Sequence, residues 1–166
     1  ILLILVLVGL FFRSFITSAT PPITIGVAFA VVLALIYGIG QVLNVFFITE
    51  MMLLVSMMGA GCDYCIFIIA RYREELRSGK DHHAALHEAI KWAGESISIS
   101  GASVIIGFGA MFICSFSMVS TMGICLALGI IVALLAALTL IPSILAVVGD
   151  KIFWPSTMER MERKGL

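Results

Sequence analysis

The chain carries long stretches without a single charged residue, one from Ile97 to Val148 and another from Ile23 to Val45. A membrane-spanning helix needs about 20 mostly apolar residues, because the hydrocarbon core is about 30 Å thick and an α-helix rises about 1.5 Å per residue. Overall, 61% of the residues are apolar and 12% are charged, against about 45–50% and about 25% in soluble domains. These features predict an integral membrane protein and exclude a freely soluble domain or a disordered segment.

We predict an all-α, polytopic membrane helix bundle in residues 1–150, followed by a tail at 151–166. Pro21 and Pro22 suit the start of a helix better than its interior, which places the start of the second span at Ile23. The first span is too short to cross a bilayer, so we expect it to be truncated and the sequence to be a segment of a larger protein. The five expected spans are residues 1–12, 23–45, 51–70, 97–115 and 122–148.

The basic residues predict the orientation, because Lys and Arg gather in short cytoplasmic loops. Threading five spans through the membrane puts all ten Lys and Arg residues on one side. The two loops on the other side, around Asn44–Glu50 and around Ser117, contain none. We therefore expect the cell (cytoplasmic) membrane, with the N-terminal end extracytoplasmic and the tail cytoplasmic. The formal net charge of zero argues against a nucleic-acid partner.

The polar stretch between the third and fourth spans predicts a cytoplasmic interfacial helix at about 81–93. Asp81 can cap this helix, and Trp92 lies near its end. Its apolar residues recur at helical spacing, and such a face would lie along the membrane surface. They are Leu86, Ala89, Ile90 and Ala93. The plain role of such a helix is to connect two spans.

Asp63 is the acidic residue that we expect at membrane depth. The helical rise places it about 12 Å from the cytoplasmic edge of its span. Even the mildest scale assigns about 2.5–3.5 kcal/mol to an Asp at the centre of a spanning helix. Such residues usually face a bundle interior, where they relay protons or bind ions. Proton or ion handling is our preferred interpretation, and an Asp that only joins helices is the alternative.

Small and hydroxylated residues accompany Asp63 on its own span. Tyr64 adds a hydroxyl that can donate or accept a proton. Ser56, Gly59 and Ala60 lie one and two turns earlier on the same face, where small side chains let another helix approach closely. We expect these three residues to serve helix packing.

A second small, polar stripe follows one face of the fourth span. Ser103 is expected level with Asp63, and Ser100 lies one turn closer to the cytoplasm. Helix packing and a functional role are equally good interpretations of this stripe. Its members are Ser96, Ser100, Ser103 and Gly107.

The run Gly59–Tyr64, followed by Phe67 and Arg71–Glu74, resembles the fourth-span signature of the resistance-nodulation-division (RND) superfamily. It is most similar to the mycobacterial-membrane-protein-large (MMPL) branch, also called hydrophobe/amphiphile efflux type 3. Residues 123–149, with Leu140–Leu145, resemble the sixth span of that branch, and Phe153–Pro155 resembles the segment directly after that span.

The resemblance implies that the chain corresponds to spans two to six of one six-span half of an exporter. It implies proton-driven export of lipids or other hydrophobic molecules, with protons as the coupling ion and no other cofactor. Asp63 and Tyr64 match the Asp-Tyr pair that carries protons in the family, and Ser100 looks like a hydrogen-bonding companion. We place Ser103 in the same expected relay because of its depth. The implied partners are the other six-span half, extracytoplasmic domains, membrane lipids and a hydrophobic substrate; the sequence leaves a homo-oligomer open.

Two other function classes compete with the exporter. The five-span unit is also similar to a sterol-sensing domain, which would make it a lipid-sensing or regulatory module without transport of its own. An intramembrane aspartyl protease needs two carboxylates at one site, and the expected spans contain only Asp63. We therefore expect no enzymatic activity.

We expect no metal site. Cys62 and Cys65 form a CxxC motif, but a second pair of ligands is missing. His83 and His87 are spaced for one helix face, but the Glu of a zinc-protease motif is absent. The preferred interpretation of the cysteines is small apolar filler, and that of the two histidines is a solvated helix face. Glu50 lies in the first turn of the third span, where a helix N-terminus stabilises an acidic side chain.

Overall fold

A computed structural model of the chain describes residues 15–41 and 44–148. The expected first span at 1–12 and the expected tail at 151–166 lie outside these residues. Within them the structure is all-helical and has no strands. It consists of α2 (Phe15–Ile39), α3 (Phe47–Arg77), α4 (His82–Ala110), the short 3-10 helix η1 (Met111–Ile113) and α5 (Ser117–Val148).

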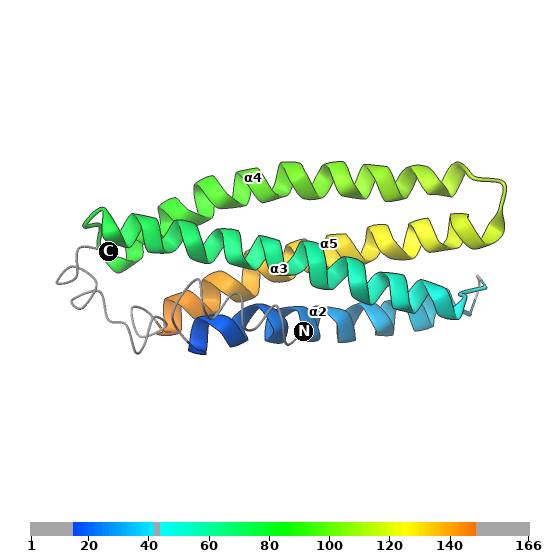
Figure 1. Cartoon of the computed structure of the whole chain (residues 1–166), viewed down its shortest axis with the longest axis horizontal. Helices are drawn as coiled ribbons and strands as arrows, with labels where there is room; N and C mark the ends of the chain where they lie inside the picture. Colours follow the sequence, from blue (N-terminus) through cyan, green and yellow to red (C-terminus); the bar gives the residue numbers. More distant parts are fainter. Residues whose placement is uncertain (1–14, 42–43, 149–166) are drawn as a thin grey trace.

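Consecutive helices run antiparallel and form one elongated bundle (Figure 1). The α2–α3 and α4–α5 connections lie at one end, and the α3–α4 turn lies at the other (Figure 1). All four α-helices are long and apolar enough to cross a membrane. The 31 residues of α3 extend over about 46 Å, which exceeds the hydrocarbon thickness of about 30 Å. The ends of α3 therefore reach beyond the hydrocarbon.

The core forms where α5 meets the other three helices. Every fourth residue of α5 is buried, and most of these residues are small: Thr121, Cys125, Gly129, Ala133, Ala137, Ile141 and Leu145. On the facing side of α3, Leu53 and Met57 are fully buried; a side chain at Gly129 would collide with Leu53 and touch Met57. Small residues on one helix thus accept large residues of its neighbour, which is the usual close packing of spanning helices.

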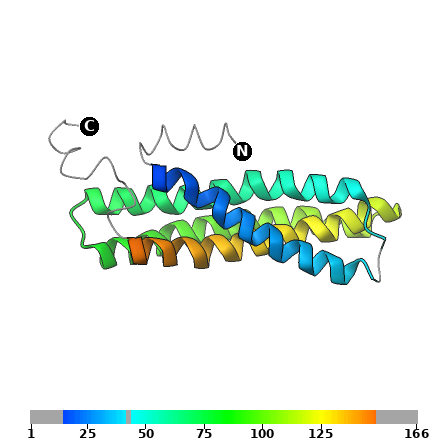
Figure 2. The same cartoon turned by 90° about the horizontal axis from the view of Figure 1, so that it is seen from below.

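The start of α2 corrects one expectation. The helix begins at Phe15, not Ile23, and contains Pro21 and Pro22 in its interior. Each proline removes one backbone donor, but spanning helices tolerate prolines where neighbouring helices support them. Thr20 and Pro21 are buried, because α2 crosses α3 and α5 obliquely and packs on both helices (Figure 2). Packing therefore extends the helix backwards through the prolines.

The segment expected as an interfacial helix is the first part of α4. One continuous helix runs from His82 to Ala110, so these described residues form no separate interfacial helix. Leu86, Ala89 and Ala93 are buried in the core, and a side chain added at Gly94 would touch Leu138 of α5. The apolar spacing was correct, but this face packs on the bundle instead of the membrane surface.

Candidate functional site

Asp63 lies near the middle of α3, on the side that faces away from α5. Gly61 belongs to the side of α3 that contacts α2 and α5, since a side chain there would collide with Ile25 and touch Ala133. Asp63 follows two residues later and is therefore rotated by about 200° around the helix axis. Its side chain is exposed in the bundle of described helices. The carboxylate thus faces outward, whereas the sequence led us to expect a residue facing the bundle interior.

A groove of about 560 Å³ runs between α3 and α4 at this level. It has two walls, one from each helix. The α3 wall is made by Gly59, Ala60, Asp63, Tyr64 and Phe67, and the α4 wall by Ser96, Ile97, Ser100 and Val104. The groove therefore brings together the carboxylate, one phenol and two serine hydroxyls in otherwise apolar and small surroundings.

Asp63 forms no ion pair among the residues that the structure describes. Tyr64 has the opposite environment: its side chain is 5% exposed, and its hydroxyl oxygen is buried near the Ser100 side chain. The site thus presents a carboxylate without a counter-ion next to a buried phenol and a serine hydroxyl.

The expected serine stripe of α4 is divided by the structure. Ser96 and Ser100 line the groove, but Ser103 does not. The Ser103 hydroxyl instead donates a hydrogen bond to the Ile99 carbonyl of its own helix, at 3.0 Å. The structure therefore brings Ser100 next to Asp63 and Tyr64 and leaves Ser103 outside this group.

The small residues that we expected to pack against another helix do not all have a neighbouring helix in the described bundle. Gly59 and Ala60 line the groove, whereas Ser56 and Gly107 do not. A side chain added at Gly59 or Gly107 would have no neighbour within 4 Å. The small faces of α3 and α4 are therefore left open by the described helices, and other glycines, such as Gly61, make the close contacts.

The cysteines and histidines do not gather into a metal-binding group. All four cysteines are free, with Cys62, Cys65 and Cys125 buried and Cys114 exposed. His83 and His87 are exposed. Over residues 15–41 and 44–148, no three His, Cys, Asp or Glu residues lie close enough to hold a metal ion.

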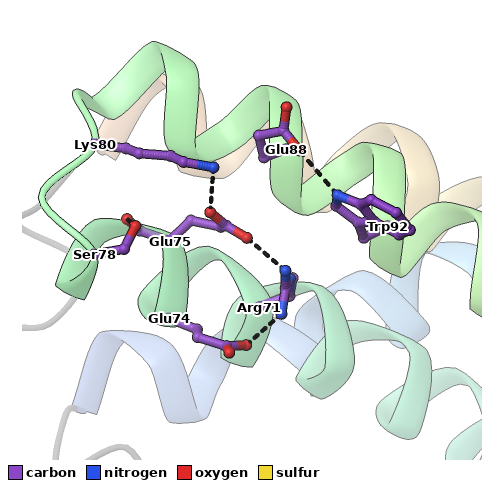
Figure 3. A network of polar contacts seen from close by, with 7 residues as sticks. All are labelled: Arg71, Glu74, Glu75, Ser78, Lys80, Glu88 and Trp92. Carbon is purple, nitrogen blue, oxygen red and sulfur yellow. Dashed lines mark hydrogen bonds and ion pairs between the residues drawn. The ribbon is translucent and has the colours of Figure 1, made fainter.

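An ionic network that we did not predict from the sequence lies where α3 ends and α4 begins (Figure 3). Arg71 bridges Glu74 and Glu75, with each nitrogen–oxygen distance 2.7 Å. Lys80 in the turn binds the other carboxylate oxygen of Glu75, also at 2.7 Å. The i,i+3 and i,i+4 spacing of Arg71 with the two acids is a signal that could have revealed the first half of this network. The contact with Lys80 depends on the turn.

Further contacts hold the same end. The Ser78 hydroxyl donates to the Glu75 carbonyl at 2.7 Å, and Gly79 adopts a φ of 84°, which glycine reaches without strain. Tyr72 of α3 and His82 of α4 share a hydrogen bond. Trp92 donates to Glu88 at 2.9 Å (Figure 3). The α3–α4 turn is therefore fixed by several polar contacts from both helices.

The four apolar helices define a multi-pass membrane protein, and a polar groove lies between α3 and α4. The MMPL family model matches residues 1–165, and the chain belongs to the MMPL family. The family resemblance inferred from the Gly59–Tyr64 run is thereby confirmed.

Three relatives illustrate this membership. The chain is 34% identical over 179 residues to "Probable transport protein MmpL10" of Mycobacterium leprae, an alignment that covers 98% of this chain and 18% of that protein. It is 31% identical over 158 residues to "Apo-petrobactin exporter" of Bacillus anthracis, covering 93% of this chain and 21% of the relative. It is 33% identical over 152 residues to "Probable transport protein MmpL8" of Mycobacterium bovis, covering 90% of this chain and 14% of that relative.

The chain thus spans about a fifth or less of the length of these relatives. Their names are those of transport proteins and exporters and not of enzymes. The chain is accordingly part of a membrane transport family.

Proposed function

We propose that this chain is a transmembrane unit of a proton-driven exporter of lipids or other hydrophobic molecules. The observation that carries the proposal is Asp63, a carboxylate without an ion pair in the described chain that faces the groove between α3 and α4. An acid in such a place changes charge by one unit when it binds or releases a proton. In surroundings of low dielectric, this change alters the local electrostatic energy strongly.

In the proposed relay, Asp63 takes a proton from the extracytoplasmic side and releases it to the cytoplasm. Tyr64 and Ser100 supply hydroxyls that can donate to the carboxylate or accept from the carboxylic acid. Both residues line the groove with Asp63. Ser103 is left out of this relay, because its hydroxyl donates to the Ile99 carbonyl of its own helix. Protons are the only coupling ion that the proposal requires.

The open groove favours a partner surface against α3 and α4. A charged Asp that faced lipid would cost about 2.5–3.5 kcal/mol or more, and covering the groove would remove that exposure. Gly59 and Gly107 leave space for an approaching helix. We assign this surface to the other six-span half of the transporter, with extracytoplasmic domains that receive the substrate.

The distribution of basic residues supports the proposed orientation in the cytoplasmic membrane. The basic residues of the described helices and turns all lie in the last turns of α3, the α3–α4 turn or the first turns of α4: Arg71, Arg73, Arg77, Lys80 and Lys91. Basic residues gather on the cytoplasmic side, so we place the α3–α4 turn there. The N-terminal end is then extracytoplasmic and the tail cytoplasmic.

A reconstituted transport assay tests the exporter. The full-length protein is placed in proteoliposomes with a fluorescent lipid, and lipid movement is measured with and without an imposed pH gradient. We expect movement that depends on the gradient and stops when a protonophore dissipates it. Lipid binding without gradient-dependent movement would contradict the exporter and favour the sensing module.

A further inference from the structure

Gly101 of α4 is buried directly behind the proposed relay. A Cβ atom at this position would lie 3.3 Å from the Tyr64 hydroxyl oxygen and 3.1 Å from Cδ2 of Leu134. These atoms approach from two different helices, α3 and α5. Gly101 is therefore a position at which α4 packs closely against both of its neighbours, one residue after Ser100.

The Tyr64 hydroxyl has little freedom to avoid an added methyl group. Its side chain is 5% exposed, and the oxygen sits at the tip of a rigid ring with two side-chain torsions. Leu134 is only half-buried, and its terminal methyl group can rotate away. A methyl group at position 101 would thus press on the phenol as well as on the leucine, and only the leucine can yield easily.

The other glycines of α4 differ from Gly101 in this respect. Side chains at Gly107 and Gly109 would have no neighbour within 4 Å. At Gly94 a side chain would touch Leu138 of α5 at 3.4 Å and no residue of α3. Among the described glycines, Gly101 is the one whose added Cβ would contact a side chain of the proposed relay.

We propose that Gly101 is a positioning residue, which leaves room for the Tyr64 hydroxyl and so fixes its place beside Asp63 and Ser100. This inference rests on the proposed function, because it concerns the geometry of the relay. Transfer between positioned groups is sensitive to small displacements, and a shift of 1 Å can reduce a rate by about a hundredfold. A shift of a few tenths of an ångström should therefore reduce proton flux by about fourfold.

The test compares proton flux at a series of pH values in proteoliposomes that contain the full-length protein. We expect Gly101→Ala to lower flux by about fourfold and to move the pH of half-maximal flux. In a Tyr64→Phe background, which lacks the hydroxyl, Gly101→Ala should have no further effect, because a double-mutant cycle isolates their interaction. Wild-type flux in Gly101→Ala, or the same loss in both backgrounds, would overturn the proposal.

A second comparison uses Leu134 and does not depend on residual flux in Tyr64→Phe. Leu134→Ala combined with Gly101→Ala removes the closer contact and relieves the packing strain. The double variant should fold and remain slow, because the contact with the phenol persists. Full recovery of flux would show that Leu134 packing caused the loss, and would also overturn the proposal.

Three controls separate the possible failures. Gly109→Ala and Gly94→Ala add the same methyl group to α4 away from Tyr64 and should keep wild-type flux. Asp63→Asn, measured in the same preparation, tests the relay itself. Flux that survives Asp63→Asn contradicts the proposed function, whereas loss in Asp63→Asn with normal Gly101→Ala contradicts only the role of Gly101.

Discussion

Adjacent residues of the proposed relay lie in opposite environments. Asp63 is exposed to the groove, whereas Tyr64 is buried in the wall beside it. The cause is helical geometry, because consecutive side chains are about 100° apart around the axis. The carboxylate can therefore exchange protons through the groove, while the phenol is held in place by packing against α4.

Replacing Tyr64 by Phe separates the role of the hydroxyl in proton transfer from the packing of the ring. The ring keeps its packing and only one hydroxyl is lost, so the free energy of unfolding should change by no more than about 1 kcal/mol. Proton flux should nevertheless fall. Unfolding in mixed micelles and flux in proteoliposomes measure the two effects. Strong destabilisation with unchanged flux would show that the phenol is only structural.

The sequence identified Asp63, Tyr64 and Ser100 as neighbours because helical spacing and family resemblance both act locally. It did not reveal that Gly101 approaches Tyr64, or that Ser103 bonds to its own helix. Those facts depend on how α4 is rotated relative to α3 and α5. Two serines three residues apart look equivalent in a sequence, but only one of them faces the groove.

At the scale of the elements, the spacing of apolar residues predicted four helices that the structure contains, but it did not predict what their faces contact. The spacing of Leu86, Ala89 and Ala93 predicts a face on the membrane surface, but this face packs in the core. Pro21 and Pro22 predict a helix start at Ile23, but the helix begins earlier, at Phe15. In both cases tertiary packing outweighed a correct local pattern.

The crossing of α4 and α5 depends on Gly123. A Cβ atom there would lie 2.6 Å from the Phe108 carbonyl oxygen and 2.6 Å from the Met111 Cβ. Because a backbone atom cannot move aside as a side chain can, Gly123→Ala should destabilise the bundle by about 1–3 kcal/mol. Gly109→Ala, which meets nothing within 4 Å, is the matched control and should be neutral or stabilising by up to about 1 kcal/mol. Equal unfolding midpoints in mixed micelles would refute this account of the crossing.

The α3–α4 turn offers a matched pair of acidic residues. The Glu75 side chain is 7% exposed and binds both Arg71 and Lys80, whereas Glu74 is 67% exposed and binds Arg71 alone. Glu75→Gln removes the charge between two cations and should lower the melting temperature by a few degrees. Glu74→Gln removes an exposed pair and should have a smaller effect, because solvent screens such pairs. The same melting temperature for both variants would argue against a stabilising role of Glu75.

At the scale of the whole molecule, the core residues that pack on α5 and the relay residue Asp63 occupy different faces of α3. One face packs Leu53 and Met57 against the small residues of α5, and the other presents Asp63 to the groove. The bundle can therefore be stable while the acid changes its charge. It also leaves the relay at a surface that a second helical unit can cover, which agrees with a chain that spans about a fifth or less of its relatives' lengths.

The central claim is that Asp63 carries the protons, and proton flux under an imposed pH gradient tests it most directly. Asp63→Asn keeps the shape of the side chain and removes its titration, while Glu50→Gln alters an exposed acid in the first turn of α3. We predict that flux disappears in folded Asp63→Asn and persists in Glu50→Gln. Wild-type flux in folded Asp63→Asn would contradict the account and leave Asp63 as a residue that only joins helices.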